Sequence, residues 1–318
     1  MNALRFHSFG PPEVLSIEEI NKPEPAAGEV VVQIIAAAIN PSDVKNVAGA
    51  FKATTLPRVP GRDFAGTVLS GTRYLGQTVW GSVPDFGIGR DGTHAEYVLL
   101  PEPVLSIKPA NLTIEQAAAV GVPFTTAWGA LMGAAQLRAG ETVLIVGAAG
   151  MVGQAATQIA NWKGAKVLGA RLGNNPLPGV AAVVDTSKGD LRERVSELTN
   201  GKGADVVFDT VGGPMFEPAL SCLGRGGRQV AITSTGDQRV SFNLVDFYHN
   251  SSRLIGFDSY GLSLEEAAGI FDELRAGFEA NALSPPQIET VPFGDAVAAY
   301  RRVASGSTKA KIVLSFSS

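Results

Sequence analysis

The sequence predicts an α/β protein that combines a β-rich domain with a second domain built on a doubly wound parallel sheet. Two observations predict this fold class. In the first third of the chain, short apolar runs are separated by closely spaced turn residues. From about residue 113, strand patterns that are almost wholly apolar alternate with helical ones, which is typical of parallel strands buried on both faces. At roughly 150 residues per domain, the 318 residues suffice for two domains.

The first third is predicted to consist of short strands. Residues 31–39 (VVQIIAAAI) form an apolar run with β-branched side chains, and the turn Ala26-Ala27-Gly28-Glu29 precedes it. Glycine and proline then recur at short intervals as far as Pro101. Frequent turns between short strands indicate a barrel-like or sandwich-like domain.

The remainder opens on a helix at Thr113, where a capping pattern precedes a run of alanines. Strands and helices are then expected to alternate. Strands are predicted at 142–147, 166–170, 204–209, 228–233 and 311–316, and helices at 151–163, 191–199, 216–223 and 264–278.

Charge and cysteine content exclude several classes of protein. The formal net charge is −4, so there is no basic footprint for nucleic acid. Cys222 is the only cysteine, which excludes an intramolecular disulfide and the usual structural zinc sites. The first residues show no apolar signal core, and none of the apolar stretches noted approaches the roughly 20 residues that span a bilayer. We therefore expect a cytoplasmic protein that binds neither nucleic acid nor membrane.

The loop Gly147-Ala148-Ala149-Gly150-Met151-Val152-Gly153 follows a strand and opens a helix, as a dinucleotide site requires. Gly150 lacks a Cβ, so backbone can approach a pyrophosphate, and Gly153 lets the helix pack closely on the strand. The helix N-terminus offers N–H groups to an anion. The alternative is a tight strand-to-helix turn without a nucleotide. The cofactor contacts predicted here are Ala149, Gly150, Met151 and Val152.

Residues near the other strand ends predict which cofactor binds. An acidic residue about 20 residues after the loop would bind the ribose 2′-hydroxyl and favour NAD, but residues 169–175 contain none. Arg171 is placed to meet a 2′-phosphate, which favours NADPH over NADH, unless it is only a solvated side chain. Further contacts are expected where open sheets bind ligands, after the third and fourth strands, at Val211, Thr233 and Ser234.

Six motifs follow one another in a recognisable order. They are Asn40-Pro41-Ser42-Asp43 with residues 60–68 (PGRDFAGTV), residues 92–98 (GTHAEYV), 123–128 (PFTTAW), the loop 147–153, 203–213 (GADVVFDTVGG) and 309–314 (KAKIVL). With them the chain resembles the medium-chain dehydrogenase/reductase superfamily, in particular its zinc-free quinone oxidoreductase (zeta-crystallin-like) branch. The resemblance implies a GroES-like catalytic domain of residues 1–120, completed by 259–318, and a Rossmann dinucleotide-binding domain of residues 121–258. It places the ligand cleft between them.

The resemblance also implies the type of reaction. Zinc-dependent relatives place a cysteine where this chain has Asn40 and a histidine where it has Arg62, so the usual metal ligands are missing. Without a Lewis acid, a quinone or an α,β-unsaturated carbonyl compound fits as hydride acceptor better than an alcohol does as donor. The expected protein is an NADPH-dependent, zinc-independent oxidoreductase. The alternatives are an enoyl-thioester reductase and a non-catalytic NADPH-binding redox sensor.

The resemblance assigns roles to three residues of the catalytic side. Asn40 would donate a hydrogen bond to the substrate oxygen and line the nicotinamide, or would only initiate the turn before Pro41. Asp43 would order that loop or the substrate, or would cap a helix. Thr126 would lie beside the nicotinamide, or would bond to a carbonyl of its own helix.

Two further implications concern the second domain. Residues 254–257 (LIGF) resemble the edge strand through which relatives form homodimers, with Phe257 near the nicotinamide; the alternative is an interior strand of a monomer. Relatives also have a full helix between the second and third strands. Residues 174–182 leave little room for one, and Pro176 and Pro178 disfavour it.

Overall fold

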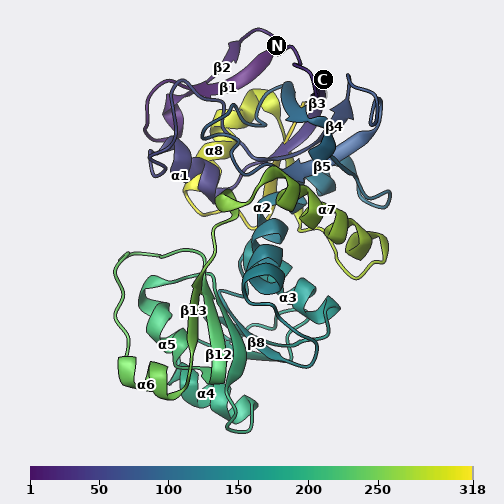
Figure 1. The fold of residues 1–318 in the computed structure, drawn as a ribbon. Coiled ribbons are helices and arrows are strands. Elements are labelled where there is room, and N and C mark those ends of the chain that lie inside the picture. The colour runs from purple at the N-terminus through teal and green to yellow at the C-terminus, as the bar shows by residue number, and fades with distance from the viewer. Residues whose placement is uncertain (317–318) are drawn as a thin grey trace. The chain divides into compact units, whose positions relative to one another are not determined.

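The computed structural model describes residues 1–316, and its contacts divide the chain into two compact units. The first unit consists of Met1–Thr125 together with the chain from Tyr260 onward. The second unit is Thr126–Ser259. The sequence places the two junctions at 120/121 and 258/259, a few residues earlier. Figure 1 shows the two units, each with its own sheet.

The first unit is rich in short strands. Its longer elements are β1 Asn2–Phe6, β2 Leu15–Glu19, β3 Glu29–Ala38, α1 Pro41–Val47, β4 Asp63–Val68, β5 Thr78–Ser82, β6 Tyr97–Pro101, β7 Ser106–Ile107, the first part of α2 Ile114–Trp128, α7 Leu264–Glu279, β14 Ile288–Pro292, α8 Ala296–Ala304 and β15 Lys311–Ser315. Single turns of 3-10 helix are η1 Pro12–Val14, η2 Glu102–Val104, η5 Ser259–Gly261 and η6 Phe293–Asp295.

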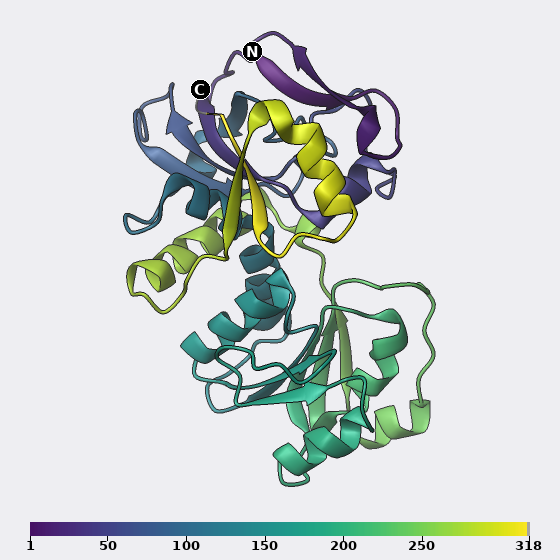
Figure 2. The ribbon, with the colours of Figure 1, turned by 180° about the vertical axis from the view of Figure 1, so that it is seen from behind.

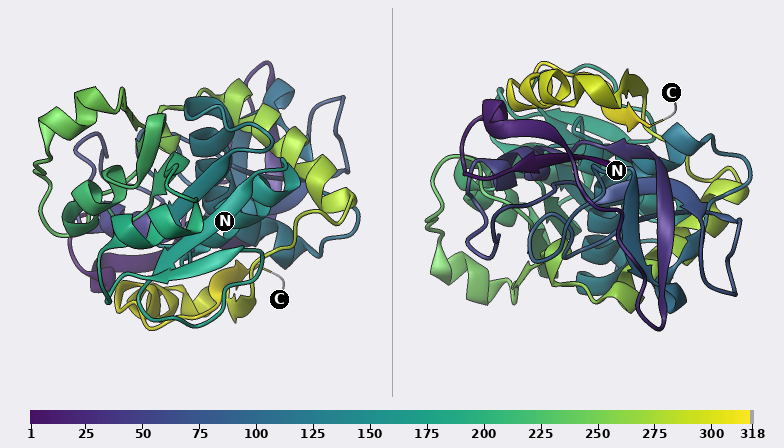
Figure 3. Two further views of the ribbon diagram at one scale, coloured as in Figure 1. Left: turned by 90° about the horizontal axis from the view of Figure 1, so that it is seen from below. Right: turned by 90° about the horizontal axis from the view of Figure 1, so that it is seen from above.

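A 7-stranded sheet in the order β14-β15-β3-β4-β5-β7, with β6 also paired to β3, holds this unit together. The C-terminal strand β15 runs antiparallel to β3, with Val313 opposite Ala38. Helix α8 lies beside β14 and β15 (Figure 2), and its buried Tyr300 packs in one core with Phe6 and Leu314. The hairpin β1–β2 forms a separate sheet, drawn in purple in the right-hand view of Figure 3.

The second unit alternates strands and helices. Its elements are the end of α2, the π-helical segment η3 Gly129–Ala134, β8 Thr142–Val146, α3 Met151–Trp162, β9 Lys166–Arg171, β10 Ala182–Asp185, α4 Leu191–Leu198, β11 Ala204–Asp209, η4 Gly213–Met215, α5 Phe216–Leu220, β12 Leu223–Ala231, α6 Leu244–His249 and β13 Arg253–Gly256. No helix forms at residues 174–182, as the prolines predict.

The six strands of this unit are all parallel, in the order β10-β9-β8-β11-β12-β13. Figure 1 shows α3 on one side of the strands and α5 on the other. The side that faces α4 and α5 buries Leu144, Leu168, Val195 and Phe216. This is the strand order of a Rossmann fold, so the predicted combination of a β-rich GroES-like domain with a doubly wound parallel sheet is confirmed.

Two predicted boundaries are wrong. The helix expected at 216–223 ends at Leu220, because the main chain pairs with β11 from Cys222 onward: Cys222 O accepts from Ala204 N at 2.9 Å. The strand expected at 228–233 begins at Leu223 and ends at Ala231. Strand β10 was not predicted. Three of its four residues are only partly buried, so the strand is too short and too exposed to give a hydrophobic pattern in the sequence.

One apolar helix is longer than the sequence reading allowed. Within residues 1–316, the continuous segment Ile114–Ala134 has 21 residues, and its most apolar 18-residue window has a mean hydropathy of 1.3, enough by length and composition to cross a membrane. This segment was not among the apolar stretches noted in the sequence. The protein itself buries 72% of the most apolar window, and a core helix passes the same test.

Candidate functional site

The glycine-rich loop between β8 and α3 has the tight geometry that its sequence predicts. Gly147 has φ +82°, a conformation that side chains other than glycine rarely adopt. A Cβ on Gly153 would lie 2.4 Å from the Gly147 carbonyl oxygen and 2.7 Å from Ala148 Cα. The close approach of α3 to the strand therefore requires glycine at position 153.

Gly150 is different, because no contact with the rest of residues 1–316 requires glycine at this position. Its φ of −75° suits any residue, and an added Cβ would come no nearer than 3.4 Å to the Gly147 oxygen. It is exposed and forms the N-cap of α3, whose first N–H groups have no partner within the helix. The open space above Gly150 fits the pyrophosphate of a dinucleotide, which needs close contact with backbone.

The other cofactor residues predicted from sequence in this unit gather at the same, carboxyl-terminal edge of the sheet. Asp209, the last residue of β11, accepts hydrogen bonds from Val211 N at 3.0 Å and Gly212 N at 2.9 Å. A Cβ on Gly212 would lie 2.2 Å from Thr233 O, so the two loops that carry Val211 and Thr233 touch backbone to backbone. Ser234 comes next in the chain, and its hydroxyl donates to Asp237 O at 2.7 Å.

Phe257 follows the edge strand β13, and its N–H donates to Ala231 O at 3.1 Å. Its ring packs so closely on Gly129 that a Cβ there would lie 2.1 Å from the ring carbon Cζ. Thr126 is in α2 and 7% exposed. The structure thus brings the loop, Val211, Thr233, Ser234 and Phe257 to one sheet edge, and fixes Phe257 against the start of η3.

Arg171 ends β9, beside Asp185 of β10. Its side chain is partly buried, and its Nε donates to the Leu172 carbonyl at 3.1 Å. The Asp185 carboxylate accepts from Gly173 N at 2.8 Å and from the Ser187 hydroxyl at 2.7 Å. The hydrogen bond from Ser187 is the main reason that the pKa of Asp185 is lowered. The sequence reading missed Asp185, which ends β10 and anchors the loop after Arg171.

In the first unit, five buried residues form a cluster of charges and an amide, here named the buried polar cluster: Asn40, Asp43, Arg62, Asp63 and Lys311. The antiparallel register of β15 and β3 places Lys311 opposite Asn40. Lys311 Nζ donates to Asn40 Oδ1 and lies 3.7 Å from Asp63 Oδ2. Asn40 Nδ2 donates to the same oxygen at 2.9 Å. The cluster therefore joins the ends of β3, β4 and β15.

The kink in α2 completes the cluster. Gly121 interrupts the helix with φ −20° and ψ −110°, and Pro123 follows two residues later. The freed Val122 N–H donates to Asp63 Oδ1 at 2.9 Å. A Cβ on Gly121 would lie 2.1 Å from the Asp63 carboxylate, so position 121 requires glycine.

Asp43 combines both roles considered for it. Its Oδ2 accepts from Asn40 N at 2.7 Å, which caps the start of α1 and orders the Asn40–Pro41 turn. Burial, and next the negative charge of Asp63, raise its pKa to about 6, while the Asn40 N–H and the cations Lys311 and Arg62 act in the opposite direction. Burial also lowers the pKa of Lys311, which the two carboxylates oppose.

The sequence reading missed the parts of this cluster that lie farthest apart along the chain. Lys311 appeared only as the first residue of an apolar strand, and Arg62 only as the residue that replaces a metal ligand. Tyr260, whose ring stacks on Arg62 at 3.7 Å, was not singled out. A lysine that begins an otherwise buried strand was the available signal, because isolated buried lysines are rare without a partner.

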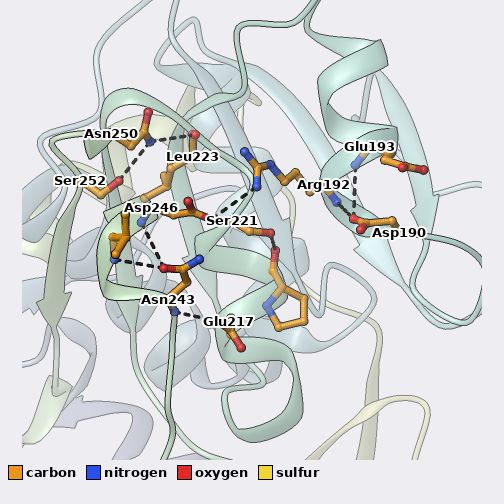
Figure 4. Close-up of polar contacts among 12 residues, drawn as sticks. Asp190, Arg192, Glu193, Glu217, Ser221, Leu223, Asn243, Asp246, Asn250 and Ser252 are labelled. Atoms are coloured by element: carbon orange, nitrogen blue, oxygen red, sulfur yellow. Dashed lines mark hydrogen bonds and ion pairs between the residues drawn. The ribbon is translucent and has the colours of Figure 1, made fainter. Parts of the chain in front are cut away.

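A second hollow lies at the opposite, amino-terminal ends of β11, β12 and β13. It has a volume of about 770 Å³. Figure 4 shows polar contacts in and around it. Its walls are already joined to one another: Arg192 lies 3.7 Å from Asp246, and Asn243 N donates to Glu217 at 2.8 Å. We assign no ligand to it.

Among residues 1–316 no group of three or more His, Cys, Asp and Glu side chains comes together that could hold a metal ion. Two family models match the chain: an alcohol dehydrogenase GroES-like domain over residues 26–110 and a zinc-binding dehydrogenase domain over residues 152–274.

Relatives match over almost the full length. A zinc-type alcohol dehydrogenase-like protein of Schizosaccharomyces pombe is 39% identical, over 99% of this chain and 98% of its own. A quinone oxidoreductase of Sus scrofa is 30% identical, with coverages of 99% and 98%. An alcohol dehydrogenase superfamily protein of Novosphingobium aromaticivorans has a similar crystal structure, with a TM-score of 0.88, 30% identity and complete coverage of both chains.

The two glycines of the loop give a matched pair of variants. Gly153→Ala should lower the free energy of unfolding by about 1–3 kcal/mol, because its methyl group meets backbone atoms. Gly150→Ala should leave stability within about 0.5 kcal/mol but weaken dinucleotide binding. Urea unfolding and a fluorescence titration with NADPH measure the two effects. Equal binding by Gly150→Ala and the unaltered protein would count against a pyrophosphate at this position.

The raised pKa of Asp43 predicts a pH-dependent stability. The folded state binds a proton that the unfolded state loses near pH 3.8, so stability should decline as pH rises from about 4 through 6. The decline should be about 3 kcal/mol, since the pKa rises from 3.8 to about 6. Asp43→Asn cannot titrate and still accepts from Asn40, so its unfolding free energy should lack this decline. Glu273→Gln, at an exposed position on α7, is the control; a decline that persists in Asp43→Asn would have another source.

Proposed function

Because the chain belongs to the medium-chain dehydrogenase/reductase family, we propose that it is an NADPH-dependent, zinc-independent oxidoreductase that transfers hydride to a quinone or an α,β-unsaturated carbonyl compound. Oxidoreductase relatives such as the porcine quinone oxidoreductase support the general class. The choice of NADPH and of the acceptor belongs to the proposal.

The observation that carries the proposal is the open approach to Gly150. The strand order of the second unit puts this glycine at the point where the sheet connections change direction, which is where open α/β sheets bind dinucleotides. The chain itself has no need of glycine there, since a Cβ would meet only one atom, at 3.4 Å. A bound pyrophosphate, which needs close contact with the backbone, would explain why glycine occupies position 150.

When bound, a nicotinamide cofactor supplies the hydride. The residues of this chain would then bind and orient. Met151 and Val152 N–H groups would hold phosphate oxygens, and Arg171 would face the 2′-phosphate. On the substrate side, Asp63 uses one hydrogen of Asn40 Nδ2, and the second is the one assigned to the substrate oxygen. Thr126 is assigned to the nicotinamide.

The alternatives differ in the step after cofactor binding. An enoyl-thioester reductase would use the same cofactor residues and a longer acyl substrate. A redox sensor would bind NADPH without turnover. Cys222, the lone thiol, is a poor candidate for the sensing group, because burial raises its pKa to about 12.

The proposed function can be tested with two nucleotides and four acceptors. The purified protein should bind NADPH more tightly than NADH in a fluorescence titration, and should oxidise NADPH with benzoquinone, phenanthrenequinone or cyclohexenone. Turnover of crotonyl-coenzyme A alone would favour the enoyl-thioester reductase. Tight binding without turnover would favour the sensor, and the absence of binding to either nucleotide would refute the proposal.

Arg171→Glu tests the cofactor preference separately. Replacing the cation with an anion should raise the Kd for NADPH about 10-fold or more, because a charge-assisted hydrogen bond becomes a repulsion. The Kd for NADH, which has no 2′-phosphate, should change much less. An equal change for both nucleotides would remove Arg171 from the 2′-phosphate site.

We further propose a homodimer in the cytoplasm, with β13 as the contact. This strand is at the end of the sheet and pairs, among residues 1–316, with β12 alone. Leu254 on β13 is 41% exposed, and Leu244 and Tyr248 on the preceding α6 are 62% and 58% exposed. An unpaired edge with exposed apolar neighbours is a template for pairing with a second copy.

Leu254→Arg should convert the homodimer to a monomer, because it puts a charge into the apolar contact. The free energy of unfolding of the monomer should change by no more than about 0.5 kcal/mol, because Leu254 is exposed. Size-exclusion chromatography with light scattering measures the mass. A monomeric unaltered protein, or a variant that remains dimeric, would contradict the proposed interface.

A further inference from the structure

The ring of Phe257 fills a space that exists only because residue 129 is glycine. A Cβ on Gly129 would lie 2.1 Å from the ring carbon Cζ of Phe257, and 2.8 and 2.9 Å from the adjacent carbons Cε2 and Cε1. Gly129 is buried, Phe257 is partly buried, and both belong to the second unit. The contact therefore joins the end of the edge strand β13 to the segment that directly follows α2.

The segment against which the ring packs is next to a residue of the proposed cofactor site. Thr126 lies in the last turn of α2, and Gly129 follows that helix directly. A second contact holds the same turn, because the ring of Trp128 lies 5.7 Å from the ring of Trp162 on α3. The end of α2 thus has two aromatic supports, and Phe257 is the one that comes from the edge of the sheet.

Strand β13, which directly precedes Phe257, has little support within one chain. Among residues 1–316 it pairs with β12 alone, and Arg253, Leu254 and Gly256 are exposed. Segments with few buried contacts and exposed backbone hydrogen bonds open most readily. Pairing of the outer edge of β13 with a second copy would add hydrogen bonds that hold the strand, and with it Phe257, in place.

We propose that the homodimer controls the nicotinamide site through this contact: pairing of β13 with a second copy holds the Phe257 ring on Gly129, which fixes the turn that carries Thr126. This rests on the proposed function, which takes β13 as the homodimer contact and assigns Thr126 to the nicotinamide. Phe257 is then a positioning residue. In a separate chain the packed arrangement is only partly populated, and the apparent Kd for NADPH rises in proportion.

Two variants separate the ring from the homodimer. Phe257→Leu retains an apolar side chain but cannot fill the space over Gly129, and it should remain dimeric. Leu254→Arg retains the ring and should be monomeric. Each has a matched control in the first unit. Phe9→Leu removes a ring that likewise packs on a glycine, with 3.2 Å between its Cγ and a Cβ on that glycine, and Leu75→Arg changes a leucine that is 59% exposed.

Three measurements are made on each protein. Light scattering gives the mass, and calorimetry gives the Kd for NADPH and for adenosine 2′,5′-bisphosphate. Hydrogen exchange gives the opening rate of the amides of residues 126–131. Adenosine 2′,5′-bisphosphate has the 2′-phosphate of NADPH but no nicotinamide, so Thr126 takes no part in binding it. A general loss of structure in the second unit would weaken the binding of both ligands.

For Phe257→Leu and Leu254→Arg we expect the Kd for NADPH to rise about 10-fold, which corresponds to a packed population of about one tenth. The Kd for adenosine 2′,5′-bisphosphate should not change, and the amides of residues 126–131 should exchange faster. Both controls should behave as the unaltered protein does. An unchanged Kd for NADPH in either variant, or equal losses for the two ligands, would overturn the proposal.

Failure of the proposed function gives a different result. If the unaltered protein binds neither NADPH nor the bisphosphate, the cofactor site fails, and hydrogen exchange decides the coupling alone. Faster exchange at residues 126–131 in Phe257→Leu and Leu254→Arg, but not in the controls, would still support the link from β13 to α2. Equal exchange in all proteins, or an unaltered protein that is a monomer, would overturn it.

Discussion

The first unit depends on a single buried carboxylate. Asp63 receives hydrogen bonds from Val122 N and Asn40 Nδ2, and Lys311 lies 3.7 Å away. A buried carboxylate costs several kcal/mol unless such partners compensate it, so the three segments cannot separate without exposing or orphaning the charge. The kink of α2 at Gly121 follows from the same requirement, because only a broken helix frees the Val122 N–H for Asp63.

The second unit relies on a different constraint, the approach of backbone to backbone. Gly153 lets α3 contact the Gly147 carbonyl, and Gly212 lets the loop after β11 contact Thr233. These contacts bring strand ends together at one edge of the sheet. Gly150 is the exception within this set, since the chain tolerates a Cβ there. Comparing what each glycine of the loop touches therefore separates Gly147 and Gly153, which the fold requires, from Gly150, which it does not.

Local patterns made much of this architecture predictable, whereas the cluster was not. Apolar strands such as β11, at 204–209, were predicted to the residue because burial on both faces leaves a continuous signal. The loop before α3 was predictable for the same local reason. The contact of Asn40 with Lys311 joins residues 271 positions apart and exists only through the register of β3 and β15. Tyr260 escaped notice because its contact with Arg62 joins residues far apart in the sequence.

The charges of the cluster bear directly on Tyr260. Arg62 and Lys311 are cations, and Asp63 and Asp43 are their counter-ions, so the cluster is close to neutral when Asp43 is ionised. The pKa of Asp43 is raised to about 6. The negative charge of Asp43 raises the pKa of Tyr260, and the positive charge of Arg62 lowers it. When Asp43 is protonated below that pH, its contribution is lost and the contribution of Arg62 remains. Asp43 is itself sealed from solvent, yet its charge acts on the pKa of Tyr260, which is only partly buried.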